Sequence, residues 1–233
     1  MLDFHMHILP AVDDGSDSVE TSMAMLRMSA EQGVEYIAAT PHFYAERMTL
    51  ESFLTRRRDA FALFTDAIGG EAGLPRLLLG AEVHFFTGIS TFDGLDALCL
   101  DGTKFLLLEM PFHTWSEHML HEVDAISCRG LIPVAAHIER YLTVQPAALM
   151  RRFLELDILI QCNASFFLER RTSRRALKML QQGQVHFLGS DSHNMDSRKP
   201  DLGPALALIE KKLGSAALAH LADFEALVLD SRR

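Results

Sequence analysis

The first strand predicted along the chain has the sequence LDFHMH (residues 2–7), in which a short apolar run leads into two histidines. Side chains on a strand alternate between its faces, so His5 and His7 point to one face while Met6 points to the other. Two imidazole groups side by side at a strand end are typical of metal ligands. The same pattern, an apolar run followed by a side chain able to bind metal, recurs along the chain. The fold must therefore bring the ends of several strands together at one place.

Six further side chains of this kind close apolar runs elsewhere in the sequence. They are His42, Glu82, Glu109, His137, Asp191 and His193. Asp191 and His193 repeat the alternate spacing of the first pair. Nitrogen and oxygen donors collected from the ends of many strands indicate a metal-dependent hydrolase.

Short apolar runs alternate with amphipathic segments over the 233 residues. Strands are predicted at residues 2–6, 34–39, 76–82, 104–109, 131–136, 157–161 and 185–189. Helices are predicted at residues 50–67, 116–129, 146–155, 171–182, 203–213 and 215–229. A further helix starts after Asp17 or Ser18, buries Val19, Met23, Leu26 and Ala30, and ends at Gly33.

Seven strands that alternate with helices predict an α/β fold with a parallel sheet closed into a barrel. In such barrels the functional site lies at the C-terminal ends of the strands, where the metal-binding side chains are expected. An open doubly wound sheet is the structural alternative. It would place ligands mainly at one switch point, which suits six ligand-bearing strands less well.

Length and composition indicate a single domain over residues 1–233, with 48% hydrophobic and 23% charged residues. No stretch is long and apolar enough for a transmembrane helix, and a strand at the start leaves no room for a cleavable signal. We therefore expect a cytoplasmic protein without membrane insertion. The net charge of −9 opposes nucleic-acid binding, which depends on cations that neutralise phosphates.

The three cysteines, Cys99, Cys128 and Cys162, are odd in number and widely spaced, which predicts reduced thiols in the core. Cysteine-dependent tyrosine phosphatases need an arginine six residues after the nucleophile. The corresponding positions hold Phe105, Val134 and Leu168, so that chemistry is excluded. No serine or cysteine triad is indicated either.

Six motifs together resemble one known family. They are HMHILPAVDDG (5–15), ATPH (39–42), GAE (80–82), LEMP (108–111), PVAAHIERY (133–141) and GSDSHN (189–194). The family is the bacterial metal-dependent protein-tyrosine phosphatases of the polymerase-and-histidinol-phosphatase (PHP) superfamily, associated with capsular and exopolysaccharide synthesis. The sequence departs from the family at Met6, Ala11, Ile138 and Ser192, where Ser, Gly, Pro and Ala are usual.

The resemblance implies a distorted seven-stranded (β/α)7 barrel of the PHP fold that holds three divalent metal ions. His5, His7, Glu82 and Asp191 would bind the first ion; Glu82, Glu109 and His137 the second; Asp14, His42 and His193 the third. Mixed imidazole and carboxylate donors make manganese the leading candidate, with iron, zinc or magnesium as alternatives. Nine ligands do not close three coordination shells, which leaves positions for water and substrate.

The resemblance also implies a mechanism and a partner. A metal-bridged hydroxide would attack the phosphorus of phosphotyrosine, with Arg140 and Arg198 holding the phosphoryl oxygens. The tyrosyl leaving group has an ordinary pKa of about 10 and needs little help from an acid, for which Asp13 is a weak candidate. The substrate would be a phosphotyrosine protein, such as a bacterial tyrosine kinase or a regulator of polysaccharide synthesis.

Three other functions stay open on sequence grounds. A histidinol-phosphate phosphatase or another small-molecule phosphoesterase would use the same metal ligands. A polymerase-associated nuclease shares them too, although a short acidic chain argues against it. A non-catalytic scaffold with a structural metal is the third reading, and the complete ligand set argues against that. Asp14 also fits a plain turn, and Arg140 and Arg198 also fit surface ion pairs.

Several other side chains were assigned from their position alone. Phe43, Tyr44, Phe112 and Trp115 follow ligand-bearing strands and are candidates to stack on a phosphotyrosine ring or to pack in the core. Arg170, Arg171, Arg174, Arg175 and Lys178 form a basic cluster that either attracts an acidic phosphopeptide or is a solvated helix face. A solvated face is the prediction for Arg56, Arg57 and Arg58, and His84 is predicted to be structural or exposed.

Overall fold

The structure, a computed structural model, describes residues 1–232. The strands are β1 (Leu2–Met6), β2 (Tyr36–Ala39), β3 (His42–Phe43), β4 (Arg76–Leu79), β5 (Glu82–His84), β6 (Phe105–Glu109), β7 (Ile132–Ala135), β8 (Leu159–Asn163) and β9 (Phe187–Gly189). The α-helices are α1 (Val19–Glu31), α2 (Leu50–Ile68), α3 (Glu117–Cys128), α4 (Ala147–Leu154), α5 (Ala164–Leu168), α6 (Ser173–Gln181), α7 (Leu202–Leu213) and α8 (Ser215–Asp230). Three 3-10 turns, η1 (Ile89–Thr91), η2 (Leu95–Leu98) and η3 (Ile138–Arg140), lie in the connections.

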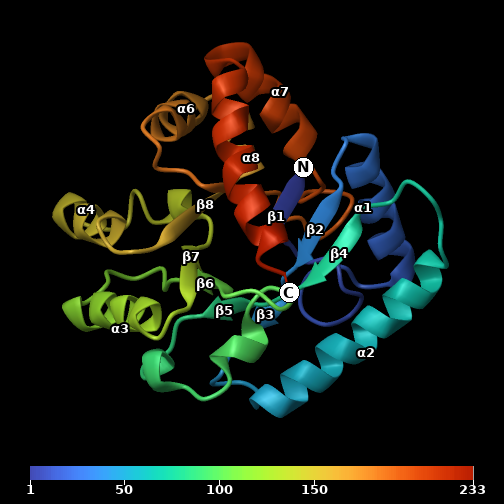
Figure 1. Cartoon of the computed structure of the whole chain (residues 1–233), viewed down its shortest axis with the longest axis horizontal. Coiled ribbons are helices and arrows are strands. Elements are labelled where there is room, and N and C mark those ends of the chain that lie inside the picture. The colour runs from blue at the N-terminus through green and yellow to red at the C-terminus, as the bar shows by residue number, and fades with distance from the viewer. Residues whose placement is uncertain (233) are drawn as a thin grey trace.

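All strand pairs are parallel, which confirms the expected α/β class. One sheet has the order β1-β2-β4 and the other β3-β5-β6-β7-β8-β9. The amide of Asp191, just after β9, donates to the carbonyl of His5 in β1 at 2.8 Å, and Met6 and Ser192 form a bridge. The last strand therefore lies beside the first, and the helices surround the strands (Figure 1).

Nine strands are found in residues 1–232 where seven were expected. The two extra strands arise from interruptions at residues 40–41 and 80–81. Pro41 has no amide hydrogen to donate at the first interruption. At the second, the carbonyl of Gly80 accepts a hydrogen bond from Arg57 Nη1 at 2.7 Å. Arg57 is thus buried against the sheet, and its predicted place on a solvated helix face is wrong.

The predicted helices are all present, each within two residues of its expected bounds. Helix α1 shows why: Ser18 caps it by accepting a hydrogen bond from the amide of Thr21, and Gly33 ends it at a φ of 80°. Its Met23 and Leu26 are buried as expected, whereas Val19 and Ala30 are only half-buried. Helix α5, with five residues, lies outside the predicted helices.

Two apolar clusters pack against the strands. The larger lies mostly between strands and helices, and the smaller includes Leu2, Phe4, Ala38, Leu78, Phe105, Leu107, Val134, Phe187 and Val228. In the smaller cluster, strands of both sheets and helix α8 contribute to one packed interior, with Phe4 and Phe187 stacked at a centroid distance of 4.1 Å. This cluster supports the strands whose ends carry the polar side chains described below.

Cys99 and Cys162 are buried, as expected, but Cys128 at the end of α3 is exposed, so its predicted place in the core is wrong. A cysteine in the last turn of an amphipathic helix can lie on either face, and here the helix turns it outward. Among the helices of residues 1–232, none is both long enough and apolar enough to span a membrane.

Candidate metal centre

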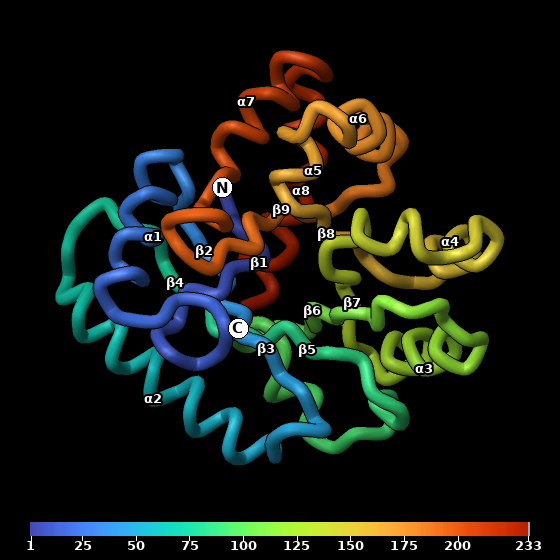
Figure 2. Tube along the Cα trace, turned by 180° about the vertical axis from the view of Figure 1, so that it is seen from behind, coloured from blue at the N-terminus to red at the C-terminus, as the bar shows by residue number. Residues whose placement is uncertain are grey.

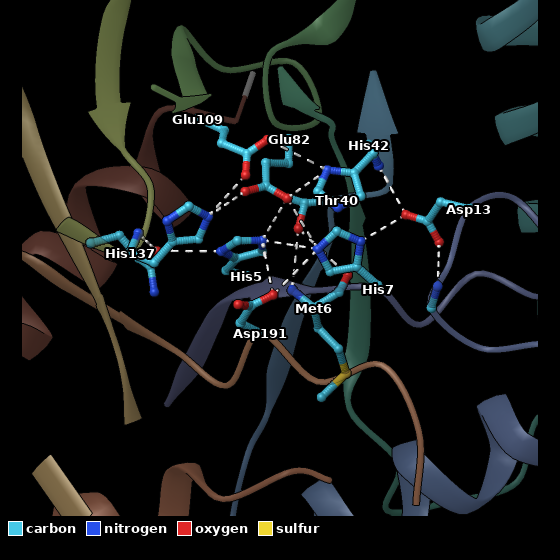
Figure 3. Close-up of polar contacts among 12 residues, drawn as sticks. His5, Met6, His7, Asp13, Thr40, His42, Glu82, Glu109, His137 and Asp191 are labelled. Carbon is cyan, nitrogen blue, oxygen red and sulfur yellow. Dashed lines mark hydrogen bonds and ion pairs between the residues drawn. The ribbon is translucent and has the colours of Figure 1, made fainter. Parts of the chain in front are cut away.

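The carboxylate of Glu82, at the start of β5, lies at the centre of four imidazole rings. Its Oε2 is 3.2 Å from His5 Nε2, 3.2 Å from His7 Nε2 and 3.0 Å from His42 Nδ1, and its Oε1 is 2.8 Å from His137 Nε2. These side chains come from the ends of β1, β3, β5 and β7 (Figure 3). The topology therefore brings together residues that lie as far apart in sequence as His5 and His137.

The other four predicted ligands lie around this group. Asp191 Oδ1 is 3.5 Å from His7 Nε2, and Glu109 Oε1 is 3.6 Å from His137 Nε2. Asp14 Oδ1 is 3.7 Å from His193 Nε2. All of the nine predicted ligands thus meet at one place. Asp14 differs from the rest because its side chain is 69% exposed.

Three sets of donor atoms are each close enough together to hold one ion. The sets are His7, Asp14, His42 and His193; His5, His7 and Glu82; and His42, Glu82 and Glu109. They overlap the three expected ligand sets, with four differences. His7 also joins the set around Asp14, and His42 also joins the set around Glu109, whereas Asp191 and His137 belong to none of the three sets.

The hydrogen bonds of three histidines fix which ring nitrogen faces the centre. His7 Nδ1 lies 2.7 Å from Asp13 Oδ2, His193 Nδ1 lies 2.9 Å from the carbonyl of Asp191, and His5 Nδ1 lies 3.3 Å from Gln161 Oε1. Each of these oxygens is an acceptor, so each Nδ1 is assigned as the donor. The Nε2 lone pairs then point inward, an arrangement common among metal-binding histidines.

The donor arrangement fits bound cations. His5 Nε2 and His7 Nε2 are 3.0 Å apart, and with both Nδ1 atoms donating outward, these two nitrogens face each other as acceptors. Four buried atoms of the cluster have no hydrogen-bond partner within residues 1–232: His42 Nδ1, Glu82 Oε2, His137 Nδ1 and His193 Nε2. Buried polar atoms without partners are costly, and a cation at the centre supplies what these acceptors lack.

The charges of the cluster also suit cations. Burial raises the pKa of Glu82, but His5, His137 and His42 outweigh burial and hold that pKa well below its ordinary value. Asp191 is likewise held below its ordinary pKa, mainly by His5 and His7 acting against burial. Burial and the neighbouring His7 and Arg198 lower the pKa of His193 to about 3. Ionised carboxylates and a neutral imidazole are the forms that bind metals. Burial lowers the pKa of His5 and His7, but the neighbouring carboxylates outweigh burial and raise both pKa values, so a bound metal would displace the protons of those two rings.

Two of the predicted ligands have strained backbones. His137 has a φ of 32° and Asp191 a φ of 52°, in the left-handed region that side chains other than glycine disfavour. Each costs about 1 kcal/mol or more, and such strain is concentrated at functional sites. Ala11, where the family usually has glycine, is the third such residue outside the glycines of residues 1–232, with a φ of 56°.

Two glycines allow the elements of the site to approach each other. A Cβ on Gly15 would lie 2.4 Å from His7 Cβ, and one on Gly189 would lie 2.6 Å from His5 Cβ. A larger residue at either position would push a predicted ligand out of place. Both glycines fall within the motifs quoted above, but their role depends on tertiary contacts.

Several residues that orient the ligands were missed at the level of sequence. Asp13 is one: it accepts hydrogen bonds from His7 Nδ1, from the amide of His42 at 2.9 Å and from the amide of Gly15 at 3.0 Å. Burial opposes its ionisation, but His7 and these hydrogen bonds lower its pKa. An anchored carboxylate of this kind is a poor general acid, so the weak candidacy of Asp13 finds no support here.

Strand β8 carries no predicted ligand, but two of its side chains form hydrogen bonds with three predicted ligands from the ends of other strands. Gln161 Oε1 accepts a hydrogen bond from the amide of His137 at 2.6 Å and faces His5 Nδ1. Gln161 Nε2 donates to Asn163 Oδ1 at 3.0 Å, and Asn163 Nδ2 donates to Asp191 Oδ2 at 2.9 Å. Two buried amides on alternate positions of a strand were the available sequence clue.

His84 was expected to be structural or exposed, and instead contacts a predicted ligand. Its Nδ1 is 2.9 Å from Glu109 Oε2, and its side chain is half-buried. The position two residues after Glu82 on β5 was the available clue, since alternate residues share a face.

Arg140 and Arg198 meet at the edge of the cluster. Both pair with Asp191: Arg198 Nη2 lies 2.7 Å from Asp191 Oδ1, and Arg140 Nη2 contacts Asp191 Oδ2. Their side chains are 34% and 37% exposed, whereas Asp191 is buried. The two guanidinium groups therefore lie between the buried donors and solvent, beside a cavity of about 760 Å³ that they help to line.

The four candidate aromatic residues divide into two pairs. Phe43 and Trp115 are buried in the core, so they cannot stack on a ligand. Phe112 is 49% exposed and, with Tyr44 and His84, lines a cavity of about 280 Å³ beside the cluster. The ring of Phe112 is stacked at 6.4 Å from that of His137, and the ring of Tyr44 is 5.1 Å from that of His42.

Comparisons with known proteins agree on one family. Residues 1–226 match the family model described as capsular polysaccharide synthesis, CpsB/CapC. The tyrosine-protein phosphatase CpsB of Streptococcus pneumoniae is 31% identical, with 95% of this chain and 94% of the relative covered. The tyrosine-protein phosphatase YwqE of Bacillus subtilis (strain 168) is 29% identical, with 92% and 86% covered.

A solved structure gives the same result at the level of the fold. It belongs to a study of YwqE from Bacillus subtilis and CpsB from Streptococcus pneumoniae, described as unique metal-dependent tyrosine phosphatases. The TM-score is 0.86 at 27% sequence identity, with 98% of this chain and 94% of the other covered.

Proposed function

The chain belongs to the CpsB/CapC family of capsular polysaccharide synthesis, and on that premise we propose that it is a metal-dependent phosphatase acting on phosphotyrosine in proteins. One observation of the structure supports this most strongly. Glu82 and eight other side chains able to bind metal meet at one place, with two arginines at their solvent edge. Cations and guanidinium groups together suit a phosphoryl group.

We assign three divalent ions to the cluster, with manganese the leading candidate and iron, zinc or magnesium as alternatives. His5, His7, Glu82 and Asp191 would hold the first; Glu82, Glu109 and His137 the second; Asp14, His42 and His193 the third. When bound, such ions withdraw charge from phosphoryl oxygens and lower the pKa of water. The outward hydrogen bonds of His5, His7 and His193 keep the donor nitrogens aimed at these ions.

Arg140 and Arg198 bind and orient the phosphoryl group. Their guanidinium groups now lie against Asp191, within reach of a phosphate at the mouth of the cluster. A planar guanidinium donates two parallel hydrogen bonds to phosphoryl oxygens and stabilises the charge that develops on them. The tyrosyl oxygen leaves readily, since the phenol has an ordinary pKa of about 10, and no side chain is required to protonate it.

The aromatic cavity accounts for a tyrosyl rather than an aliphatic leaving group. Phe112 and Tyr44 offer ring faces next to the cluster, and about 280 Å³ accommodates a single phenyl ring. Ring pairs of this kind contribute roughly 0.5–1.5 kcal/mol beyond simple burial. Histidinol phosphate, which has an alkyl chain at the ester oxygen, would gain less from these two rings.

The fold belongs to the same proposal. Taking β2 with β3, and β4 with β5, as two interrupted strands gives seven, and the contact of β9 with β1 closes them into a distorted barrel of the PHP type. The interrupted pairs stay in register, because the amide of Gly80 donates to Ala39 and that of Glu82 donates to Pro41. We propose residues 1–233 as one phosphatase domain.

We propose that the substrate in the cell is a cytoplasmic phosphotyrosine protein, either a bacterial tyrosine kinase or a regulator of polysaccharide synthesis. The family description, capsular polysaccharide synthesis, supports this choice. The acidic chain, with a net charge of −9, makes nucleic acid an unsuitable substrate.

The test compares kcat/KM for a phosphotyrosine peptide and for histidinol phosphate, in the parent protein and in Phe112→Ala. We expect the peptide to be the better substrate. We also expect Phe112→Ala to lower its kcat/KM about threefold to tenfold, and to leave histidinol phosphate unchanged. Leu63→Ala, a change at a similarly exposed apolar residue on α2, is the control. A preference for histidinol phosphate would refute the tyrosine assignment.

A further inference from the structure

A groove lies between α6 and α7, outside the metal centre. Its lining includes the cations Arg170, Arg174, Lys178 and Lys212 and the apolar side chains Leu168, Leu177 and Leu208, around a volume of about 760 Å³. We call it the basic groove. Figure 2 shows α5, α6 and α7 gathered near the top of the molecule, where α5 follows directly after β8.

The charge of the basic groove stands out against the rest of the protein. Four cations line it and no aspartate or glutamate does, although the chain as a whole has a net charge of −9. None of the four forms an ion pair with any residue in the described range 1–232. Free cations grouped in a concave surface attract anionic ligands.

Stability does not explain this placement. Arg174 and Lys178 lie four residues apart on α6, so these like charges are neighbours along the helix surface and repel each other, and Arg170 in the turn before α6 adds a third cation nearby. Arg174 also lies in the first turn of α6, where a positive charge opposes the helix dipole, and no acidic residue lies there. Lys178, in the last turn, suits the dipole, so the unfavourable position is that of Arg174, and it favours a role in binding.

The basic groove adjoins the cavity that lies beside the metal centre. Leu168, which is 37% exposed, lines both the basic groove and the cavity that contains Arg140, Asp191 and Arg198. A peptide held by its phosphotyrosine at the metal centre can therefore extend over Leu168 into the basic groove. Each extended residue advances about 3.3 Å, so several residues on one side of the phosphotyrosine would enter it.

We propose that the basic groove binds an acidic segment that lies several residues from the phosphotyrosine in the protein substrate. This inference rests on the proposed phosphatase function and specifies the substrate as an acidic phosphotyrosine protein. Carboxylates of the segment pair with the four cations. Its apolar side chains pack on Leu168, Leu177 and Leu208, which separates this site from a purely electrostatic patch.

The same run of basic residues supplies a matched control. Arg171 and Arg175 are exposed and belong to the same run of basic residues, but they do not line the basic groove. The pair Arg174→Glu and Lys178→Glu reverses two charges inside the groove. The pair Arg171→Glu and Arg175→Glu reverses two charges outside it, so both double variants carry the same net charge.

The experiment uses two phosphotyrosine peptides, one with a run of glutamates and one with glutamines at the same positions, together with para-nitrophenyl phosphate. For the groove variant we expect kcat/KM on the glutamate peptide to fall on the order of tenfold, and the loss to shrink at high salt. The glutamine peptide and para-nitrophenyl phosphate should be unaffected. The control variant should lose less than threefold on every substrate.

A binding measurement separates this proposal from the phosphatase function. Fluorescence anisotropy with the unphosphorylated glutamate peptide needs no turnover, and the groove variant should bind it more weakly than the control variant. If the groove variant binds this peptide more weakly than the control variant and no phosphotyrosine is hydrolysed, the phosphatase function fails and the groove assignment stands. Equal losses in both double variants, or no preference for the glutamate peptide, would overturn the groove assignment. So would a groove variant whose only defect is weaker sedimentation with vesicles containing phosphatidylserine.

Discussion

At the scale of single residues, the convergence of eight of the nine predicted ligands could be predicted because each of the eight closes an apolar run, and a strand end places it beside its neighbours, whereas Asp14 followed from the family resemblance alone. His5 and Glu82 show this, since they are far apart in sequence and 3.2 Å apart in the structure. The residues that orient them could not be predicted. Asp13, Gln161 and Asn163 act through hydrogen bonds that form only after distant strands come together.

The clearest residue-scale prediction concerns Gln161. Gln161→Leu removes the acceptor that faces His5 Nδ1 and the amide of His137, so both rings should lose their fixed orientation. We expect the affinity for Mn²⁺, measured by isothermal titration calorimetry, to fall about 10–100-fold. Gln182→Leu, at an exposed position after α6, should bind Mn²⁺ as the parent does. Unchanged affinity in Gln161→Leu would show that β8 does not orient the ligands.

At the scale of elements, helices were easier to predict than strands. Amphipathic spacing and capping residues such as Ser18 are local features, and they survive in the structure. The interruptions at Pro41 and Gly80 depend on neighbours, because the carbonyl of Gly80 is satisfied by Arg57 from a helix. The same reasoning explains why Arg57 was wrongly placed on a solvated face: three consecutive arginines carry no indication of which one is buried.

The contact between β1 and β9 depends on Gly189. Gly189→Ala places a methyl group against His5 Cβ, so we expect a loss of about 1–3 kcal/mol in stability and a reduced metal content. Gly203→Ala, whose Cβ would meet Gln32 Cβ at 2.8 Å, crowds a place that touches none of the predicted ligands and serves as the control. Metal content by elemental analysis should fall in the first variant and not in the second. Equal metal content in both would contradict the assigned role of this contact.

The segment before β9 gives a prediction about pH. Burial and the neighbouring His220 lower the pKa of His186 from 6.5 to about 4. Between these pH values the unfolded chain binds a proton that the folded protein does not, so His186 reduces stability as pH falls from 6.5 to 4. His186→Asn keeps an acceptor for the amide of Ile160 and cannot titrate.

Thermal unfolding of the parent protein and of His186→Asn, measured from pH 7 to pH 4, checks the predicted effect of His186 on stability. The Tm of His186→Asn should fall less steeply with acidification than that of the parent, and the two slopes should agree above pH 6.5. Parallel curves over the whole range would mean that His186 contributes nothing to acid sensitivity.

At the scale of the whole molecule, the α/β class and the gathering of ligands at one end of the strands followed from the sequence. The strand count did not, because an interruption such as the one at Gly80 depends on a contact with Arg57 from a distant helix. The basic cluster illustrates a second limit. Five cations could be recognised as a basic cluster, but only the structure separates Arg174 and Lys178, inside the groove, from Arg171 and Arg175, outside it.

The most direct test of the central claim is the rate of phosphotyrosine peptide hydrolysis as a function of metal bound per chain. Protein stripped by chelation should be inactive, and stepwise addition of Mn²⁺ should restore turnover in proportion to the metal taken up. His5→Ala should neither take up the full complement of metal nor recover activity. Full turnover by exhaustively stripped protein would contradict the account.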